Sequence, residues 1–259
     1  MNAFHSFWTK PLEGREPEEF EILTMVLSAL KWKEKNGDIY LVTDSKGREL
    51  IKAYGYESCW DKVYRDLDYI PEEIDYKRFW AAGKIYALRS MPCPVVSIDT
   101  DFIVWDSLSL EEMNTSLCVI HKEPLSEQVY PNAEELTRFC DGYSLTEAPV
   151  NAAFMYFNNT SLKEEYTLKA MEFMKSTSAE GTLVPMVFAE QRLLSMVAHK
   201  MGIETDQFSS LEKLTSGEDK RFTHLWGYKQ KVRENQELKK ELTNRLKARI
   251  KAEFKGAVY

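Results

Sequence analysis

The amino-acid sequence predicts an α/β protein with three layers (α/β/α), in which helices cover both faces of a mixed, mostly parallel sheet. Short apolar runs alternate with helical patterns over residues 3–110, which is typical of βαβ crossovers. Apolar residues make up 44% of the 259 residues and charged residues 29%, which is the composition of a globular protein. The chain shows no internal repeat, and no linker long enough to argue for separate domains.

The first elements follow from the spacing of apolar residues. In residues 18–32 they recur every three or four positions, as in a helix that packs on a core. The Asn36-Gly37 pair ends that helix, and IYLVTD after it reads as a buried strand. The same reasoning predicts, in chain order, a strand at 3–8, a helix at 18–32, a strand at 39–44, a helix at 45–54, a short strand within 60–68, a segment at 71–88 that ends in the helix FWAAGKIYAL (79–88), and a strand at 95–98.

The pattern is less regular beyond residue 110. It predicts strands at 116–121 and 152–158, and helices near 133–139, at about 162–174 and at 187–200. Gly202 suits the C-terminal cap of the last of these helices. After FTHLWGYK (222–229), a long charged helix closes the chain.

The charge of the chain is unevenly distributed. Its net value of -7 argues against generic nucleic-acid binding. Residues 229–259, however, contain ten Lys or Arg against four Glu, so this segment carries +6 and residues 1–228 carry -13. We therefore expect one domain over 1–228 and a basic amphipathic helix over 229–259. Its apolar stripe consists of Val232, Leu238, Leu242, Leu246 and Ile250. The stripe either packs on the same domain or lies on an anionic inner membrane face.

Three further features indicate the cellular compartment. The four cysteines show no CxxC or CxxH spacing, which argues against a zinc site or a disulfide framework. The N-terminal stretch lacks the basic and apolar regions of a signal peptide, and no window is apolar enough for a spanning helix. We expect a cytoplasmic protein that at most touches the inner membrane face.

Two aspartates stand in the apolar stretch VVSIDTDFIVW (95–105). If residues 95–98 form the strand, Asp99 lies at its carboxyl end and alternation places Asp101 on the same side. Two such carboxylates repel one another unless a cation or a shared proton lies between them. Carboxylate oxygens suit Mg²⁺ or Mn²⁺ with open positions for phosphate oxygens. In the alternative interpretation one aspartate caps a turn and the other faces water.

The stretch FWAAGKIYALRSMPCPVVSIDTDFIVWDSL (79–108) resembles the helix, strand and DxD segment of the nucleotide-sugar glycosyltransferases with a GT-A fold, particularly those of bacterial capsule and lipopolysaccharide synthesis. The resemblance implies a GT-A-like, Rossmann-like sheet and a nucleotide-sugar donor, with UDP-sugar expected. It also implies that Asp99 and Asp101 hold Mn²⁺ or Mg²⁺ against the donor diphosphate.

Two later stretches are similar to the same family. NAAFMYFNN (151–159) resembles the strand on the acceptor side. HLWGYK (224–229) resembles the HxxGxxK motif of the retaining branch, which implies that His224 completes the metal shell and that Lys229 meets the phosphate. Here Lys229 follows Gly227 after one residue rather than two, so Lys229 departs from the spacing of the motif whereas His224 matches it.

The remaining candidates on the donor side each have a second interpretation. The resemblance implies that Lys84 approaches the donor, but a solvated lysine fits as well. Asp44 ends the IYLVTD strand, where a nucleoside is expected, or it caps the next helix. Related enzymes contact the base and ribose at the positions of Ser6 and Trp8, although Trp8 also fits a simple core aromatic.

Glu190 and Gln191 are the candidate catalytic residues. Their place resembles that of the acid or amide groups beneath the sugar in retaining transferases, and the alternative is a surface glutamate.

These observations lead us to expect a metal-dependent glycosyltransferase, of the hexosyl class and retaining, that moves a sugar to a glycan or lipid-linked acceptor. A haloacid-dehalogenase-like phosphatase with Asp99 as nucleophile also starts from DxD after an apolar strand. Against it, the chain has Ile103 where that motif has Thr or Val, and no convincing GDxxxD follows. A third alternative is a non-catalytic GT-A-like protein that binds a glycan or a partner through its many aromatic residues.

Overall fold

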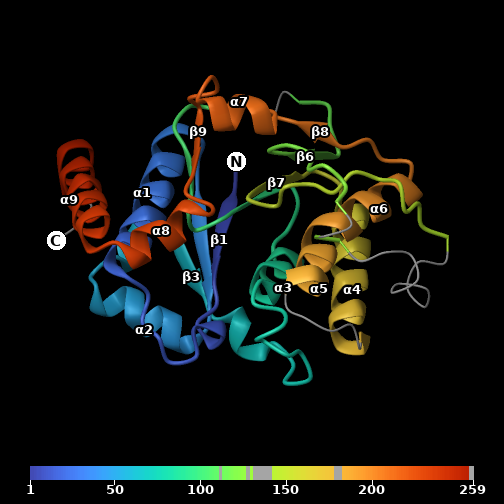
Figure 1. Cartoon of the computed structure of the whole chain (residues 1–259), viewed down its shortest axis with the longest axis horizontal. Helices are drawn as coiled ribbons and strands as arrows, with labels where there is room; N and C mark the ends of the chain where they lie inside the picture. Colours follow the sequence, from blue (N-terminus) through green and yellow to red (C-terminus); the bar gives the residue numbers. More distant parts are fainter. Residues whose placement is uncertain (111–112, 127–128, 131–141, 178–182, 257–259) are drawn as a thin grey trace.

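The computed structural model describes residues 1–110, 113–126, 129–130, 142–177 and 183–256. Its centre is a seven-stranded sheet with the order β3-β2-β1-β4-β7-β6-β8 (Figure 1). These strands are β1 Ala3–Phe7, β2 Ile39–Thr43, β3 Lys62–Tyr64, β4 Val95–Ile98, β6 Leu117–Val119, β7 Phe154–Phe157 and β8 Asp206–Gln207. β1 pairs in parallel with β2 and β4, whereas β7 runs antiparallel to both of its neighbours. The mixed, mostly parallel sheet is therefore confirmed.

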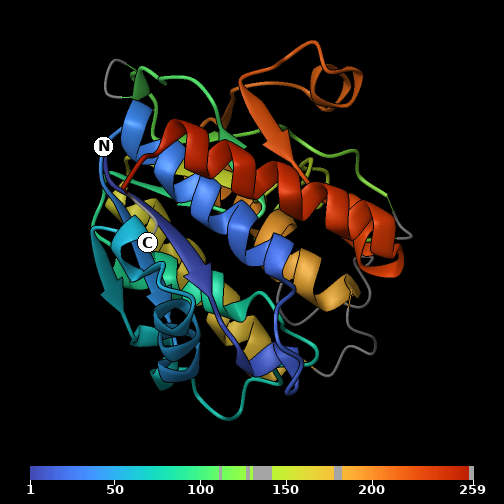
Figure 2. The same ribbon diagram turned by 90° about the vertical axis from the view of Figure 1, so that its left-hand side faces the viewer.

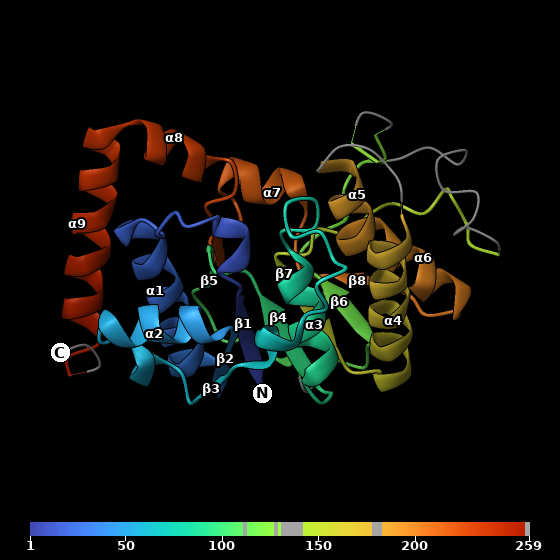
Figure 3. The same ribbon diagram turned by 90° about the horizontal axis from the view of Figure 1, so that it is seen from below.

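Helices cover both faces of this sheet (Figure 3). One layer contains α1 Glu19–Lys35, α2 Ser45–Ala53 and α9 Gln236–Glu253; the other contains α3 Ala82–Ser90, α4 Thr160–Ser176, α5 Leu183–Val187 and α6 Leu193–Lys200. Side chains alternate between the two cores: Val95 packs in the core of the second layer, and Val96 in the core of the first. The three-layer α/β fold class is confirmed.

A second, two-stranded sheet continues the chain after β4. β5 Phe102–Val104 pairs antiparallel with β9 Phe222–His224, and Phe102 lies opposite His224. α7 Leu211–Ser216 precedes β9, and α8 Tyr228–Glu234 follows it. This pairing carries a late segment of the chain to the carboxyl end of β4.

Two predicted helices have different boundaries in the structure. The helix expected at 79–88 begins only at Ala82, because turns precede it in which the Phe79 nitrogen donates to the Asp75 backbone oxygen and the Ala82 nitrogen to the Phe79 backbone oxygen. The single helix expected for the C-terminal segment is divided into α8 and α9 at Asn235. The Asn235 side chain accepts hydrogen bonds from the first-turn nitrogens of α9. The helix expected near 133–139 lies outside the described residues.

α9 runs alongside α1 (Figure 2). Leu246 and Ile250 of the predicted stripe are buried, as is Val232 on α8. The ion pairs Lys239–Glu18 at 2.9 Å and Lys247–Glu19 at 2.7 Å flank this contact. The stripe thus faces α1, and membrane contact by this segment stays a prediction. Among the described residues, every helix is too short or too polar to span a membrane.

The buried side chain of His5 links β1 to β5. Its Nδ1 accepts a hydrogen bond from Trp60 Nε1 at 3.2 Å, so its Nε2 carries the proton and donates to Ser28 Oγ at 3.0 Å. Ser28 in turn donates to the backbone oxygen of Phe102. Burial lowers the pKa of His5 from 6.5 to about 3, although the charge of Asp101 acts in the opposite direction. This network fixes the residue that directly follows Asp101.

We expect His5 to make the stability of the protein depend on pH. The unfolded chain binds a proton at His5 below pH 6.5 and the folded chain only near pH 3, so the free energy of unfolding falls as the pH is lowered through that window. The slope from this residue reaches about 1.4 kcal/mol per pH unit. Urea unfolding of the wild type and His5→Gln from pH 7 to pH 4 measures it as the difference between the two slopes. Equal slopes would contradict the prediction.

Candidate functional site

The backbone at the end of β4 places three candidate metal ligands together. Asp99 directly follows β4, and its nitrogen donates to the Ala153 oxygen at 2.8 Å. The backbone nitrogen of Phe102 then donates to the backbone oxygen of Asp99 at 3.0 Å, which closes a tight turn around Asp101. His224 is the last residue of β9. The backbone nitrogen of the following residue, Leu225, donates to the backbone oxygen of Asp101 at 3.1 Å.

Asp99, Asp101 and His224 each offer one ligand atom, and these atoms lie within 4.8 Å of one another. The Nε2 atom of His224 lies 3.6 Å from Asp101 Oδ1. The two carboxylate oxygens suit Mn²⁺ or Mg²⁺, and the added imidazole nitrogen favours a transition-metal ion such as Mn²⁺ over Mg²⁺. The structure therefore brings together the three residues that the sequence predicted as metal ligands.

Two lysines neutralise these aspartates. Lys84 of α3 forms ion pairs with Asp99 and, at 2.5 Å, with Glu190 Oε1, and it donates to the Ala152 oxygen at 3.1 Å. Lys229 of α8 lies 2.8 Å from Asp101 Oδ2. Lys84 is thus a largely buried partner of carboxylates, with a side chain 11% exposed, rather than a solvated side chain.

The pKa values of this cluster follow from burial and from these partners. Burial opposes ionisation of Asp101, but the hydrogen bond to His224 and the charge of Lys229 hold its pKa well below the usual range. Burial also opposes the charge on Lys84, but Asp99 and Glu190 raise its pKa above the ordinary value. Burial raises the pKa of Glu190, although Lys84 counteracts the rise. Asp101 and Lys84 are therefore charged at neutral pH.

A cavity of about 300 Å³ opens beside this cluster, and we call it the Asp99 cavity. The predicted site residues that line it are Ser6, Trp8, Lys84, Asp99, Asp101, Glu190 and Lys229. α3 approaches β1 closely here, since a Cβ atom on Gly83 would lie 2.8 Å from Trp8 Cβ. Glycine at this position therefore lets Ser6 and Trp8, which form part of the cavity wall, lie directly against α3.

Two predicted residues lie outside both the metal cluster and the lining of the Asp99 cavity. Asp44 caps α2: it accepts hydrogen bonds from the Gly47 nitrogen at 2.7 Å and from the nitrogen of Thr9 at 2.9 Å. It lines a neighbouring cavity of about 430 Å³ that shares Trp8 with the first. Gln191 accepts a hydrogen bond from the Tyr130 hydroxyl at 2.7 Å and lies outside the described lining of the Asp99 cavity.

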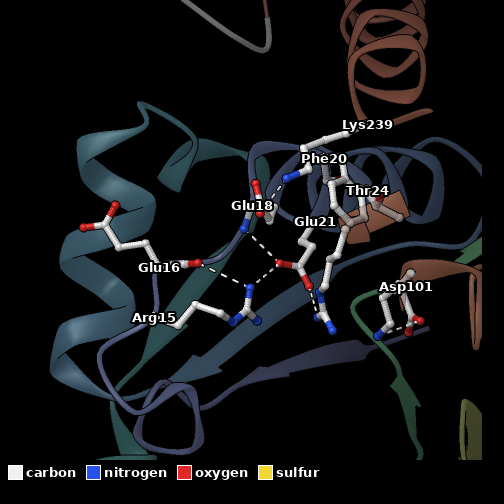
Figure 4. Close-up of polar contacts among 10 residues, drawn as sticks. Arg15, Glu16, Glu18, Phe20, Glu21, Thr24, Asp101 and Lys239 are labelled. Carbon is white, nitrogen blue, oxygen red and sulfur yellow. Dashed lines mark hydrogen bonds and ion pairs between the residues drawn. The ribbon is translucent and has the colours of Figure 1, made fainter. Parts of the chain in front are cut away.

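The sequence interpretation missed three charged residues of the cavity wall: Arg15, Glu21 and Arg233. Arg15 lies 3.1 Å from Glu21 Oε2, and Arg233 forms an ion pair with Glu21 Oε1. Figure 4 shows the side chains of Arg15 and Glu21 pointing toward one another, on the same side of α1 as Asp101. Arg233 follows Lys229 by one helical turn, a spacing that the sequence displays. Arg15 carries no comparable signal.

Comparison with solved structures finds glycosyltransferases of low similarity. Mouse xyloside xylosyltransferase 1 is 12% identical, with 80% of this chain and 85% of that chain covered and a TM-score of 0.44. GlyE of Streptococcus pneumoniae TIGR4 is 18% identical, with 82% and 45% covered and a TM-score of 0.43. The PaToxG glycosyltransferase is 11% identical, with 83% and 71% covered and a TM-score of 0.47. Similarities this low assign neither a substrate nor a reaction.

A search of curated proteins finds no match. A family model described as "Family of unknown function (DUF6734)" matches residues 1–255, which is nearly the whole chain. The protein therefore belongs to DUF6734, a family of unknown function.

Proposed function

We propose that the protein is a metal-dependent glycosyltransferase of the GT-A type that moves a sugar from a nucleotide-sugar donor to an acceptor hydroxyl. The observation that carries the proposal is the convergence of Asp99, Asp101 and His224 at the carboxyl end of β4, beside a cavity that also contains Lys84 and Lys229. In parallel sheets this edge is where ligands bind.

The charges of the Asp99 cavity support a metal–diphosphate ligand. The charged residues described in its lining are the cations Arg15, Lys84, Lys229 and Arg233 and the carboxylates Glu21, Asp99, Asp101 and Glu190. Their formal charges cancel, so a bound divalent cation would leave the cavity at +2. A nucleoside diphosphate sugar carries two negative charges on its diphosphate and would restore neutrality. A cation and such a donor therefore suit this cavity as a pair.

Each residue has a proposed role in that complex. Asp99, Asp101 and His224 hold the cation, which supplies electrostatic stabilisation of the leaving nucleoside diphosphate. Lys84 and Lys229 form ion pairs with carboxylates of the site in this structure. In the complex they would pair with phosphate oxygens of the donor instead. Ser6 and Trp8 line the cavity at the end of β1, where we place the base and ribose of the donor.

Of the two candidate catalytic residues, we assign the role to Glu190. It lies in the π-helical turn Phe188–Arg192 between α5 and α6, and such turns are frequent at functional sites. Its carboxylate lines the Asp99 cavity, whereas Gln191 contacts Tyr130. A UDP-sugar donor, hexosyl transfer with retention, a glycan or lipid-linked acceptor and the division of the chain at residue 228 stay predictions.

The proposal is tested by the thermal unfolding midpoint of the protein with UDP or GDP, each with and without Mn²⁺. We expect UDP to raise the midpoint only when Mn²⁺ is present, because a ligand of the folded state stabilises it by mass action. Release of UDP from UDP-hexoses then identifies transfer or donor hydrolysis. Stabilisation without any UDP release favours a binding protein. Mg²⁺-dependent hydrolysis of p-nitrophenyl phosphate, with no nucleotide effect, would favour the phosphatase instead.

A further inference from the structure

Trp226 combines two properties that packing does not explain. Its side chain is 50% exposed, and its backbone φ is 33°, in the left-handed region that a bulky residue rarely adopts. The adjacent Gly227 has an ordinary φ of -64°, so the strained conformation falls on the tryptophan although a glycine stands next to it. Strain of this kind is concentrated at functional sites.

The neighbours of Trp226 hold its ring plane in a defined orientation. The ring stacks on His224 with 5.7 Å between centroids and an interplanar angle of 2°, and the ring of His121 lies 6.5 Å away. The His224 ring lies parallel to the indole, while Trp226 as a whole is 50% exposed to solvent. The result is a flat aromatic surface fixed beside a candidate metal ligand.

Trp226 lines a further cavity of about 400 Å³, which we call the Trp226 cavity. His224 lines it too, while the Nε2 atom of His224 lies 3.6 Å from Asp101, which lines the Asp99 cavity. His224 therefore lies between Asp101 of the metal cluster and the Trp226 cavity. The His224 side chain would then separate a ligand in the Trp226 cavity from the donor diphosphate at the metal cluster.

Polar residues line the same cavity. Thr215, Asp219 and Thr223 line the Trp226 cavity. The Asp219 carboxylate is fixed by Arg221 at 2.7 Å, and Thr223 Oγ1 accepts a hydrogen bond from Trp105 Nε1 at 2.8 Å. A cavity lined by an exposed aromatic residue and by residues with hydroxyl and carboxylate groups fits a sugar ring, whose C–H face is apolar and whose hydroxyls point outward.

We infer that the Trp226 cavity is a carbohydrate-binding subsite in which a pyranose ring stacks on Trp226. That this sugar is the acceptor rests on the function proposed above. The competing explanation is that Trp226 only positions His224. The two explanations predict different effects of replacing Trp226. If Trp226 only positions His224, its loss impairs the binding of Mn²⁺ and UDP; if it is a platform for the acceptor, Mn²⁺ and UDP still bind.

The test uses fluorescently labelled full-length protein on a printed array of neutral and acidic glycans, with Mn²⁺ and UDP present. The variants are Trp226→Ala, Trp226→Phe and Trp226→Gly, the last of which accepts the left-handed backbone without strain. Tyr69→Ala, at an aromatic residue that is 82% exposed, is the matched control. Thermal unfolding with Mn²⁺ and UDP is measured on every variant.

We expect wild type, Tyr69→Ala and, more weakly, Trp226→Phe to bind a defined set of glycans. The alanine and glycine variants should lose roughly tenfold or more in apparent affinity while the thermal shift by Mn²⁺ and UDP is kept. Absence of glycan binding by the wild type, or unchanged binding by Trp226→Ala, would overturn the inference. Loss of the Mn²⁺ and UDP shift in both variants would overturn it in favour of positioning. Tryptophan-dependent glycan binding without any nucleotide effect in the wild type would keep the subsite and refute the transferase.

Discussion

Replacing Asp101 by asparagine is expected to abolish the Mn²⁺-dependent stabilisation by UDP and to lower sugar transfer by roughly 10²-fold to 10³-fold or more. Asp101 is 6% exposed, with one oxygen toward His224 and the other 2.8 Å from Lys229. An amide is a weaker ligand for a divalent cation than a carboxylate. At a UDP concentration one hundred times its Kd, the wild type should gain about 2.7 kcal/mol, and the variant none.

The asparagine variant also leaves the Lys229 ammonium without its carboxylate, so each protein is compared with its own nucleotide-free state. Asp106→Asn, at an exposed aspartate of the segment that follows β5, is the control and should behave as the wild type. Thermal unfolding and UDP release from a UDP-hexose are the two measurements. If Asp101→Asn keeps both, Asp101 is not a ligand of the cation.

Replacing Lys84 by methionine is expected to lower the free energy of unfolding by about 3–5 kcal/mol, because it removes one member of a buried ionic cluster. The Lys84 side chain is 11% exposed, and the side chain of its partner Glu190 is 10% exposed. Without the ammonium, the carboxylates of Asp99 and Glu190 face one another with no positive charge between them.

Two further measurements separate charge from packing at this position. The double variant Lys84→Met with Glu190→Gln should recover part of the lost stability, since it removes one of the uncompensated charges. Mn²⁺ alone should stabilise Lys84→Met more than it stabilises the wild type, because the ammonium no longer competes for Asp99. Lys52→Met, at an exposed lysine of α2, is the control. Urea unfolding that shows no rescue and no Mn²⁺ effect would mean that Lys84 acts through packing alone.

The metal cluster was predictable only in part from local patterns. Asp99 was found because a short apolar strand precedes it, and the structure places it directly after β4. Spacing alone gave no reason to join His224 to it, since their proximity depends on the antiparallel pairing of β5 with β9. The family resemblance supplied that link. A single sequence gives little information about which distant segments pair with one another.

Other differences have similarly local causes. Phe79 is 1% exposed and was read as part of a helix, but it fills the core from a turn that precedes α3. The break between α8 and α9 was readable, because Asn235 is a favoured N-cap residue. The sequence analysis did not predict Arg15 and Arg233 as site residues, and they line a cavity because α8 packs beside the start of α1.

The pairing of β5 with β9 also sets an order of events during synthesis. Asp99 and Asp101 leave the ribosome well before His224, by on the order of ten seconds at ordinary elongation rates. Throughout that interval the apolar strand Phe102–Val104 lacks the partner strand that it pairs with in the folded protein. The nascent chain consequently carries an open strand edge and an incomplete ligand set, and both are completed in one step when β9 arrives.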